Sequence, residues 1–382
     1  MAKLGDICTI ISGSTPKSNI PEYWDGDIKW ITPAELNEGT YIINDSVRHI
    51  TELGVAKTGL KPFPQGTVIL SSRAPIGKTA IAGCEMYCNQ GFKNLICSDR
   101  INPRYLYWFL TCNTEYLNSL GRGATFKEIS KEIVANIEIP LPAMEQQISV
   151  AEKFEKISEL IALRKEQLAK LDQLVKSRFI ELFGTIHDNK FGYEIKTLQD
   201  VCEQIKDGTH QTPTYTDDSV NGYKFLSSKD VTTGKIDWTH LKYIPEELHN
   251  ELYARIAPRK GDILLAKNGT TGIAAVVDRD EIFDIYVSLA LLRPIEINSV
   301  YLWAAINSVE TKQQFDSSLK GIGVPNLHLG EIKKAKIIVP PMDEQKRFAT
   351  FVEQVDKQKL TTQQSLDKLE VMKKALMQEY FG

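Results

Sequence analysis

The sequence predicts a mixed α/β (α+β) protein made of two copies of one module, each a globular domain followed by a long coiled-coil helix. Two observations support this prediction: the second half repeats the first in register, and each half ends in a heptad-like pattern. The chain of 382 residues is long enough for two or three domains. Because the period is far longer than that of a solenoid repeat, we interpret the copies as complete domains.

The repetition extends over nearly the whole of both halves. The stretch from Gly66 to Gly77, "GTVILSSRAPIG", aligns without a gap with "GDILLAKNGTTG", from Gly261 to Gly272, at an offset of 195. Further matches are "KLGDIC" (3–8) with "TLQDVC" (197–202), "INPRYLYW" (101–108) with "INSVYLWA" (297–304), and "ELFG" (181–184) with "EYFG" (379–382). Chance similarity would not keep one register over this length, so we infer a duplication.

Each globular part contains apolar runs bounded by Gly and Pro, which are typical of strands. These runs predict strands within 67–72, 78–83 and 93–97 of the first copy, and within 262–267, 273–277 and 288–293 of the second. The stretch 102–120 predicts a helix with Asn102 as its N-cap and Pro103 in the first turn. The matching helix of the second copy is expected to start near Ser299.

A coiled-coil helix follows each globular part. Both begin with Pro-x-x-Glu-Gln, at Pro142 to Gln146 and at Pro341 to Gln345, an offset of 199. Proline ends the globular part, and a glutamate in the first helical turn suits the helix dipole. The predicted boundaries are a first domain at 1–142, a first helix at 143–184, a second domain at 185–340 and a second helix at 341–382. From Met144 to Leu182 such a helix would be about 58 Å long.

The apolar seam predicts that the two helices pair with each other, since a helix this long cannot bury its seam alone. The predicted helix-pair interface consists of Phe154, Ile157, Ile161, Leu168, Leu171, Val175, Val352, Val355, Leu366, Leu369 and Leu376.

Composition narrows the class of protein. With 42% hydrophobic and 25% charged residues, the chain is typical of globular proteins, and it shows no signal peptide and no apolar run of membrane-spanning length. Six scattered cysteines indicate reduced thiols, and hence a cytoplasmic protein without a metal site. The net charge of −3 excludes a globally basic nucleic-acid binder. Any DNA contact must therefore come from local patches or from a partner.

Catalytic motifs are missing from the sequence. Gly77-Lys78-Thr79 imitates the end of a phosphate-binding loop, but Ser72 occupies the position of its first glycine. The sequence has no G-x-S-x-G or H-E-x-x-H motif, and its six histidines do not cluster. We therefore expect no catalytic residues in this chain.

Polar and basic loops recur at matching places in both copies and predict a binding face. Their glycines let backbone approach a ligand, while Ser, Thr, Lys, Arg and Asn side chains can contact phosphates or base edges. The candidate DNA-binding residues are Ser14, Thr15, Lys17, Arg73, Lys78, Arg122, Thr209, His210, Lys267, Asn268 and Lys320. For a single loop taken alone, ordinary turn chemistry is the favoured interpretation, and only the recurrence of three such loops in both copies favours a binding face.

The chain as a whole resembles the specificity subunit of type I restriction-modification systems. The resemblance rests on the helix starts "PAMEQQISVAEKFEKISELIALRKEQLAKL" and "PPMDEQ", and on the domain starts "KLGDICTIISGSTP" and "TLQDVCEQIKDGTHQTP". It implies two target-recognition domains, each reading one half of a split asymmetric DNA site, and an antiparallel, pseudo-twofold helix pair between them. The implied partners are double-stranded DNA, two methyltransferase subunits and restriction motor subunits. S-adenosylmethionine, ATP and Mg²⁺ are implied for those subunits and no cofactor for this chain.

Two other interpretations stay open from the residues alone. The chain could be a coiled-coil scaffold for protein partners, or a DNA-modifying enzyme whose motifs have diverged.

Overall fold

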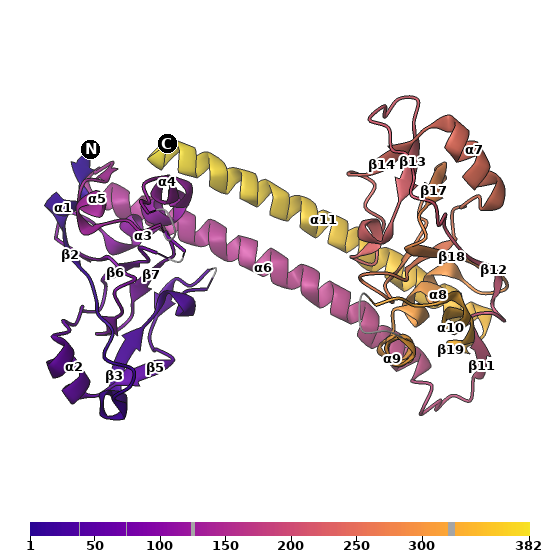
Figure 1. The fold of residues 1–382 in the computed structure, drawn as a ribbon, viewed down its shortest axis with the longest axis horizontal. Helices are drawn as coiled ribbons and strands as arrows, with labels where there is room; N and C mark the ends of the chain where they lie inside the picture. Colours follow the sequence, from indigo (N-terminus) through magenta and orange to yellow (C-terminus); the bar gives the residue numbers. More distant parts are fainter. Residues whose placement is uncertain (38, 74, 124–126, 320–324) are drawn as a thin grey trace. The chain divides into compact units, whose positions relative to one another are not determined.

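The computed structural model describes residues 1–37, 39–73, 75–123, 127–319 and 325–382. The chain forms two compact units, and each contains one globular domain together with parts of both long helices (Figure 1). The first unit consists of Met1–Lys165 and Gln364–Gly382, and the second of Glu166–Gln363.

The globular domain of the first unit is a mixed α/β fold with a five-stranded sheet of order β2-β9-β6-β7-β4, a three-stranded sheet of order β5-β3-β8, and the pair β1-β10 (Figure 1). Its elements are β1 (Ala2–Lys3), α1 (Leu4–Ile7), β2 (Cys8–Ile11), β3 (Trp24–Ile31), β4 (Ile42–Ile43), β5 (Arg48–Ile50), α2 (Glu52–Thr58), β6 (Val68–Leu70), β7 (Thr79–Ala82), β8 (Tyr87–Cys88), β9 (Asn94–Cys97), α3 (Pro103–Cys112), α4 (Thr114–Ser119), α5 (Lys131–Ala135) and β10 (Glu138–Ile139).

The second globular domain has a four-stranded sheet of order β12-β18-β15-β16, a three-stranded sheet of order β14-β13-β17, and the pair β11-β19. Its elements are β11 (Glu194–Thr197), β12 (Cys202–Asp207), β13 (Tyr223–Leu226), β14 (Lys242–Ile244), α7 (Glu246–Arg255), β15 (Ile263–Ala266), β16 (Ala274–Val276), β17 (Phe283–Ile285), β18 (Leu289–Pro294), α8 (Ser299–Ile306), α9 (Val309–Ser318), α10 (Leu329–Lys334) and β19 (Lys336–Val339).

The two domains share one topology. Strands β2-β9-β6-β7 correspond in order to β12-β18-β15-β16, and β5-β3-β8 corresponds to β14-β13-β17. In each small sheet the central strand is parallel to one edge strand, β3 to β8 and β13 to β17, and antiparallel to the other, β5 or β14. The duplication inferred from the sequence is therefore a duplication of the fold.

The predicted strands and helix starts are confirmed, with one difference. Asn102 caps α3, because its side chain accepts hydrogen bonds from the backbone N–H groups of Arg104 and Tyr105, and Asn298 caps α8 in the same way. The single helix expected over 102–120 is broken at Asn113, whose φ of −104° and ψ of 25° separate α3 from α4. The Asn113 side-chain amide donates to the carbonyl of Phe109 at 2.8 Å, so it binds the last turn of α3.

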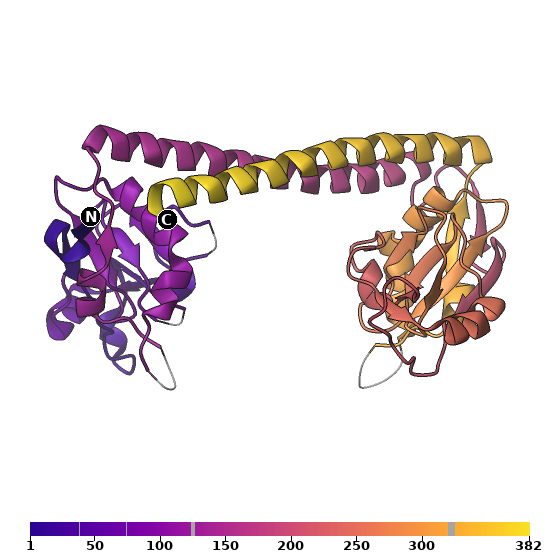
Figure 2. The same ribbon diagram turned by 90° about the horizontal axis from the view of Figure 1, so that it is seen from above.

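The two long helices are α6 (Met144–Phe183) and α11 (Met342–Phe381), each of 40 residues. In the first unit Lys153 Nζ donates to Tyr380 Oη at 2.8 Å and Arg164 Nε donates to Ser365 Oγ at 3.2 Å. Residue numbers rise along one helix as they fall along the other, so the helices pair antiparallel (Figures 1 and 2). In the second unit the same sense of pairing brings Asp172 to Lys359.

Every residue of the predicted helix-pair interface is at least half-buried. In the first unit the fully buried ones are Phe154, Ile157 and Leu366. In the second they are Leu171, Val352 and Val355. The half-buried members are Ile161, Leu168, Val175, Leu369 and Leu376. Their regular three- and four-residue spacing places them on one face of each helix.

The repeated start of the long helices differs from the sequence prediction by one position. The helices begin at Met144 and Met342 and end at Phe183 and Phe381, so their offset is 198 and not 199. At the equivalent position near the start of each long helix lies a buried glutamine, Gln147 in α6 and Gln345 in α11. Gln147 accepts a hydrogen bond from the Asn102 N–H at 2.8 Å, and Gln345 accepts one from the Asn298 N–H at 2.9 Å.

The amide nitrogens of these two glutamines explain why the position is fixed. Gln147 Nε2 donates to the carbonyls of Arg100 and Pro142, at 3.0 and 2.9 Å. Gln345 Nε2 donates to the carbonyl of Pro340 at 2.7 Å. Each glutamine therefore ties the proline-containing exit of the domain to the N-cap of the domain's own helix.

Aromatic side chains join the ends of the long helices to the domain cores. In the first unit Phe381 stacks on Phe154 with ring centroids 5.5 Å apart, and Phe154 stacks on Trp108 at 5.4 Å. In the second unit Phe183 packs edge-on against Tyr301 at 4.9 Å. Buried aromatic pairs of this kind add to the stability given by their apolar area. The C-terminal Phe of each helix is thus part of a domain core.

Candidate nucleic-acid interface

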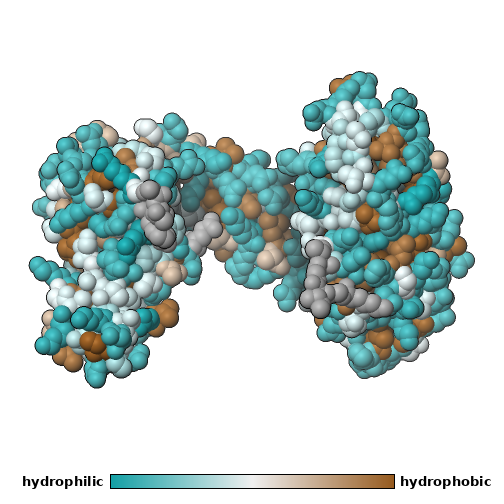
Figure 3. Space-filling view, in the orientation of Figure 1, coloured by the Kyte–Doolittle hydropathy of each residue, from teal (hydrophilic) through white to brown (hydrophobic). Residues whose placement is uncertain are grey.

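The surface of both globular domains is largely hydrophilic, with hydrophobic residues scattered among polar ones (Figure 3). The first candidate loop, 12–18, is held by its backbone. The Ser14 N–H donates to the Cys88 carbonyl at 3.0 Å, and the Trp30 indole N–H donates to the Ser14 carbonyl at 3.0 Å. At Gly13 a Cβ would lie 1.8 Å from the Cys88 oxygen, so only glycine fits this approach.

The two predicted side chains that follow in this loop, Thr15 and Lys17, face solvent. Thr15 is exposed and donates to Gln90, and Lys17 is exposed while its carbonyl accepts from the Trp24 indole at 3.2 Å. A fixed backbone with exposed polar side chains is the arrangement expected of a contact loop.

Arg73, from the second candidate loop (71–78), and Arg122, from the third (121–127), both pair with Glu128 in the first domain. Arg122 and Glu128 exchange two backbone hydrogen bonds of 3.0 Å, and Arg73 forms a β-bridge with Glu128. The Ile129 N–H adds a 3.0 Å bond to the Ser72 carbonyl. Arg122 is exposed and Arg73 half-buried. The structure therefore brings these two predicted residues together.

Two lysines lie beneath the same loops. Lys78, half-buried, donates to the Pro33 carbonyl at 3.2 Å. Lys93 is buried, and its ammonium donates to Ser72 Oγ at 3.2 Å and to Glu128 Oε1 at 2.9 Å. Lys93 was not among the predicted residues, because it lies in an apolar strand pattern that gives no sign of its carboxylate partner Glu128.

In the second domain, Thr209 is held by its backbone like Ser14. Its N–H donates to the Ile285 carbonyl at 3.1 Å, and its carbonyl accepts from the Val287 N–H at 2.9 Å. At Gly208 a Cβ would lie 2.1 Å from the Ile285 oxygen. Since Thr209 is only 6% exposed, its burial favours a role in positioning the loop.

Asp207 organises the loops of the second domain. Its Oδ2 accepts from Lys267 Nζ at 2.8 Å and lies 3.0 Å from His210 Nε2, and its carbonyl accepts from Arg255 at 2.9 Å. Partial burial would raise the pKa of the Asp207 carboxyl, but Lys267 and His210 outweigh burial and hold this pKa below its usual value. The Lys267 side chain is 7% exposed, whereas the His210 side chain is 69% exposed. Burial therefore favours Lys267 as a support, with His210 at the surface.

Asn268 of the second domain lies on a bridge between two loops. Asn268 forms an antiparallel β-bridge with Asn326, and the Leu327 N–H donates to the Lys267 carbonyl at 2.8 Å. The bridge matches the one between Arg73 and Glu128 in the first domain. Lys320, the last candidate, lies outside the described residues.

Both domains bury one lysine ammonium beneath these loops, but from different strands. Lys267 occupies the position of Ser72, as their equivalent backbone hydrogen bonds to Ser288 and Gly91 show, at 2.9 and 2.7 Å. In the first domain the ammonium comes from Lys93 on the neighbouring strand. The geometry of the loop bases is thus conserved between copies while the residues that build it differ.

Within the part of the chain that the structure describes, no group of three or more His, Cys, Asp or Glu side chains is placed to hold a metal ion. The six cysteines are free thiols. No helix among the described residues has the length and apolar character needed to cross a bilayer.

Comparison with known proteins shows similarity over the whole chain. The family model described as "Type I restriction modification DNA specificity domain" matches residues 1–173 and 191–371. The type I restriction enzyme MjaIX specificity subunit of Methanocaldococcus jannaschii is 30% identical, with 98% of this chain and 90% of that protein covered. The EcoBI specificity subunit of Escherichia coli is 25% identical over 77% of this chain and 68% of its own length.

Two solved structures have the same fold. The S subunit of a type I restriction-modification system from M. genitalium has a TM-score of 0.59 at 15% identity, with 100% of this chain and 95% of that one covered. A chain from a structure of type I restriction-modification complex assembly has a TM-score of 0.63 at 20% identity, with coverage of 100% and 96%. With its two matched segments and two copies of one fold, this chain belongs to the type I restriction-modification DNA specificity family.

Proposed function

We propose that this chain is the DNA sequence-recognition subunit of a type I restriction-modification complex. It binds a bipartite asymmetric target, with one half-site for each globular domain. The observation that carries the proposal is the pair of family matches, one on each copy, together with a shared fold whose loop residues differ. Since equivalent loops carry different side chains, the two half-sites should differ in sequence.

We assign recognition to residues 1–142 and 185–340, and the spacing of the half-sites to the paired helices, 143–184 and 341–382. Once one domain has bound its half-site, the linked second domain is held near the other half-site at a high effective concentration. The affinity of the whole chain for the target therefore rises without new contacts. The contact residues supported by exposure are Lys17, Arg122 and His210, with the half-buried Arg73 beside Arg122.

We further propose that the chain itself is non-catalytic and directs two adenine-methyltransferase subunits, and restriction motor subunits, to the target. S-adenosylmethionine, ATP and Mg²⁺ would then be bound by those partners. The free thiols of all six cysteines fit a reducing compartment, so we place the complex in the cytoplasm.

Mapping methylated adenines tests the proposal. The chain is co-expressed with its methyltransferase subunits in a host without adenine methylation, and the host DNA is sequenced for the modification. We expect one motif made of two different half-sites with a fixed gap. Methylation that is unchanged when this chain is omitted, or that follows a single continuous motif, would contradict the proposal.

A control separates this function from a protein scaffold or a diverged enzyme. The purified chain alone, incubated with DNA, Mg²⁺ and S-adenosylmethionine, should neither cleave nor methylate. The assembled complex should bind a duplex with the mapped motif more tightly than one with the half-sites scrambled.

A further inference from the structure

An arginine outside the predicted loops lies over an aromatic ring at the edge of the first domain. Arg48 begins β5, and its Cζ lies 3.6 Å from the centroid of the Trp24 ring and 6.0 Å from that of Trp30. The two tryptophans are almost fully buried and pack edge to face, with centroids 5.1 Å apart. Arg48 itself is exposed. A cation over an indole face is attracted by the ring's quadrupole.

The second domain also holds a cation over an aromatic ring: the cation lies at the same strand position, whereas the ring belongs to Tyr215, which precedes β13. Arg48 pairs with Trp30 across β5 and β3, and Lys242 pairs with Phe225 across β14 and β13. The Lys242 ammonium lies 4.1 Å from the centroid of the Tyr215 ring, which packs edge to face with Phe225 at 6.1 Å. Lys242 is exposed like Arg48. The pair of cation and aromatic ring is therefore a duplicated feature.

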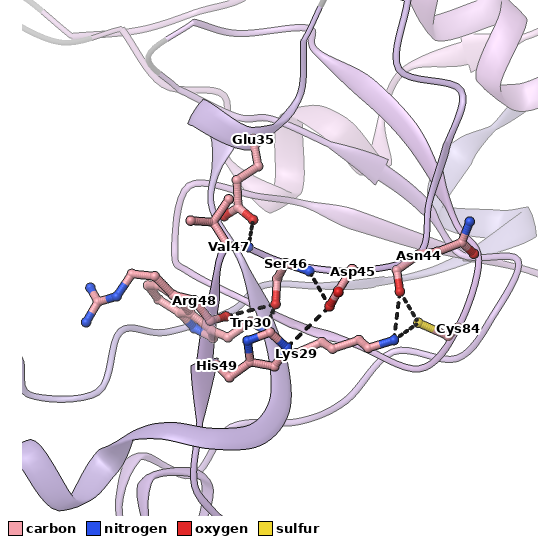
Figure 4. Close-up of polar contacts among 10 residues, drawn as sticks. All are labelled: Lys29, Trp30, Glu35, Asn44, Asp45, Ser46, Val47, Arg48, His49 and Cys84. Atoms are coloured by element: carbon pink, nitrogen blue, oxygen red, sulfur yellow. Dashed lines mark hydrogen bonds and ion pairs between the residues drawn. The ribbon is translucent and has the colours of Figure 1, made fainter.

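The segment that presents Arg48 is held by its own hydrogen bonds (Figure 4). Ser46 Oγ accepts from the Trp30 N–H at 3.0 Å and donates to the Arg48 carbonyl at 2.8 Å, and the Val47 N–H donates to Glu35 at 2.7 Å. In Figure 4 the guanidinium extends away from this network and carries none of the drawn bonds. Because the backbone is fixed and the guanidinium is held over the Trp24 ring, binding an anion costs less conformational entropy than it would for a mobile side chain.

The cation lies beside the first candidate loop. Trp24, which contacts Arg48, donates its indole N–H to the Lys17 carbonyl at 3.2 Å, and Trp30 donates to that of Ser14 at 3.0 Å. In the second domain Tyr215 follows directly on the equivalent loop, 206–214. Among the ion pairs of the described residues, neither Arg48 nor Lys242 has a carboxylate partner, so both charges are available to an external anion.

We propose that Arg48 and Lys242 are equivalent phosphate contacts, one for each half of the DNA target. This inference rests on the proposed function. Both domains have a positive charge here, but the first has an arginine over a tryptophan ring and the second a lysine over a tyrosine ring. A contact kept in both domains, whose half-sites differ, fits the DNA backbone, because phosphates are the same at every base pair and accept either charge. The contact therefore positions the DNA backbone and does not read sequence.

Salt dependence of DNA binding tests the proposal on the complex of the full chain with its methyltransferase subunits. The probe is a duplex with the mapped motif, and the dissociation constant is measured between about 50 and 200 mM NaCl. For Arg48→Met and for Lys242→Met we expect affinity about tenfold weaker. The slope of log K against log salt should fall by about 0.9 in each variant and by twice as much in the double variant. The methylated motif should be unchanged.

Matched controls are Arg100→Met and Lys260→Met, which remove exposed cations of the same units and should leave the slope as it is. Arg48→Lys should keep the slope, and it serves as a second test if Arg48→Met fails to fold. Unchanged slopes in folded Arg48→Met and Lys242→Met complexes, or a relaxed half-site in the methylation map, would overturn the phosphate assignment. If the wild-type complex shows no preference for the motif duplex, the proposed function itself fails.

Discussion

Burial of Lys267 beside Asp207 separates two roles for this lysine, a direct DNA contact or a support for the loop. We expect Lys267→Met to destabilise the second domain by about 3 kcal/mol, because it leaves a poorly solvated carboxylate without its partner. Urea unfolding measures this loss. The exposed neighbour provides a control, since Lys206→Met should leave the unfolding midpoint in place. A Lys267→Met variant with full stability but weak DNA binding would instead support a direct contact.

Asp284 predicts a pH dependence of stability. Its side chain is 1% exposed, and burial raises its pKa to about 6, while the hydrogen bond of 2.7 Å from His249 opposes the rise. A carboxyl with a raised pKa binds its proton more tightly in the folded state, so its contribution to stability is largest at low pH and falls as pH rises to about 6.

The variant Asp284→Asn should abolish this contribution. Relative to wild type, the variant should gain in free energy of unfolding between about pH 4 and pH 7, as followed by chemical denaturation at several pH values. Asp280→Asn, at an exposed position nearby, should track wild type. Parallel profiles for Asp284→Asn and wild type would refute the assignment.

Arg73 and Arg122 lie on either side of the Glu128 backbone, so their effects should be confined to the first half-site. Replacing either with Ala should weaken binding of the mapped duplex by about 1–3 kcal/mol if the residue reads a base, and base preference should relax in that half-site only. The methylation map and binding assays report both effects. Arg100→Ala provides the matched control, and an effect equal in both half-sites would exclude base reading by these residues.

Among the secondary-structure elements, each long helix is connected to its globular domain by the hydrogen bonds of the buried glutamine in its first turn. Gln147→Ala would leave the Asn102 N–H and the carbonyls of Arg100 and Pro142 without partners, so we expect a loss of about 1–3 kcal/mol. Thermal or urea unfolding of the full chain measures it. The adjacent Gln146 is exposed, and Gln146→Ala should be close to neutral. Equal effects of the two variants would show that burial at this joint contributes little.

The adjacent Gln146 and Gln147 also illustrate which features of the fold could be predicted from the sequence and which could not. Periodicity, prolines and N-caps sufficed to predict β6, β7, β9, β15, β16 and β18, the starts of α3 and α8, and both long helices. The letters "EQQ" allow either glutamine to be aligned with Gln345, and only burial of Gln147 selects the correct one. The break at Asn113 arises from a local side-chain hydrogen bond that periodicity does not register.

The candidate site was harder to predict than the fold, for a physical reason. Exposure and pairing of a lysine depend on strands distant in sequence, so Lys267 and Lys17 look alike until Asp207 is found beside one of them. Lys93 and Arg48 were missed because one partner, Glu128, is 35 residues away and the other, Trp24, is identified only through strand register. The composition of the loops therefore indicates which surface binds DNA, but it does not distinguish residues that hold the loops in place from residues that contact the DNA.

At the scale of the whole molecule, the paired helices offer a test of the proposed spacing role. Four residues inserted between Lys165 and Glu166, with four more between Gln363 and Gln364, extend both helices by about 6 Å. If the helices set the gap, the mapped motif should gain about two unspecified base pairs, at about 3.4 Å each. Sequencing of methylated adenines reads the gap directly.

The matched control for the insertion is a loop site. Four residues placed after Asp188, outside both helices, should leave the gap unchanged. An unaltered gap in the helix variant, with methylation retained, would show that the helices do not determine it.

The place of Phe381 has a consequence for synthesis on the ribosome. Phe381 stacks on Phe154 in the core of the first unit, but it follows the whole of the second unit in the chain. During synthesis Phe154 therefore lacks this stacking partner until the second unit has been made. We expect the aromatic core of the first unit to be completed after the second domain has left the ribosome.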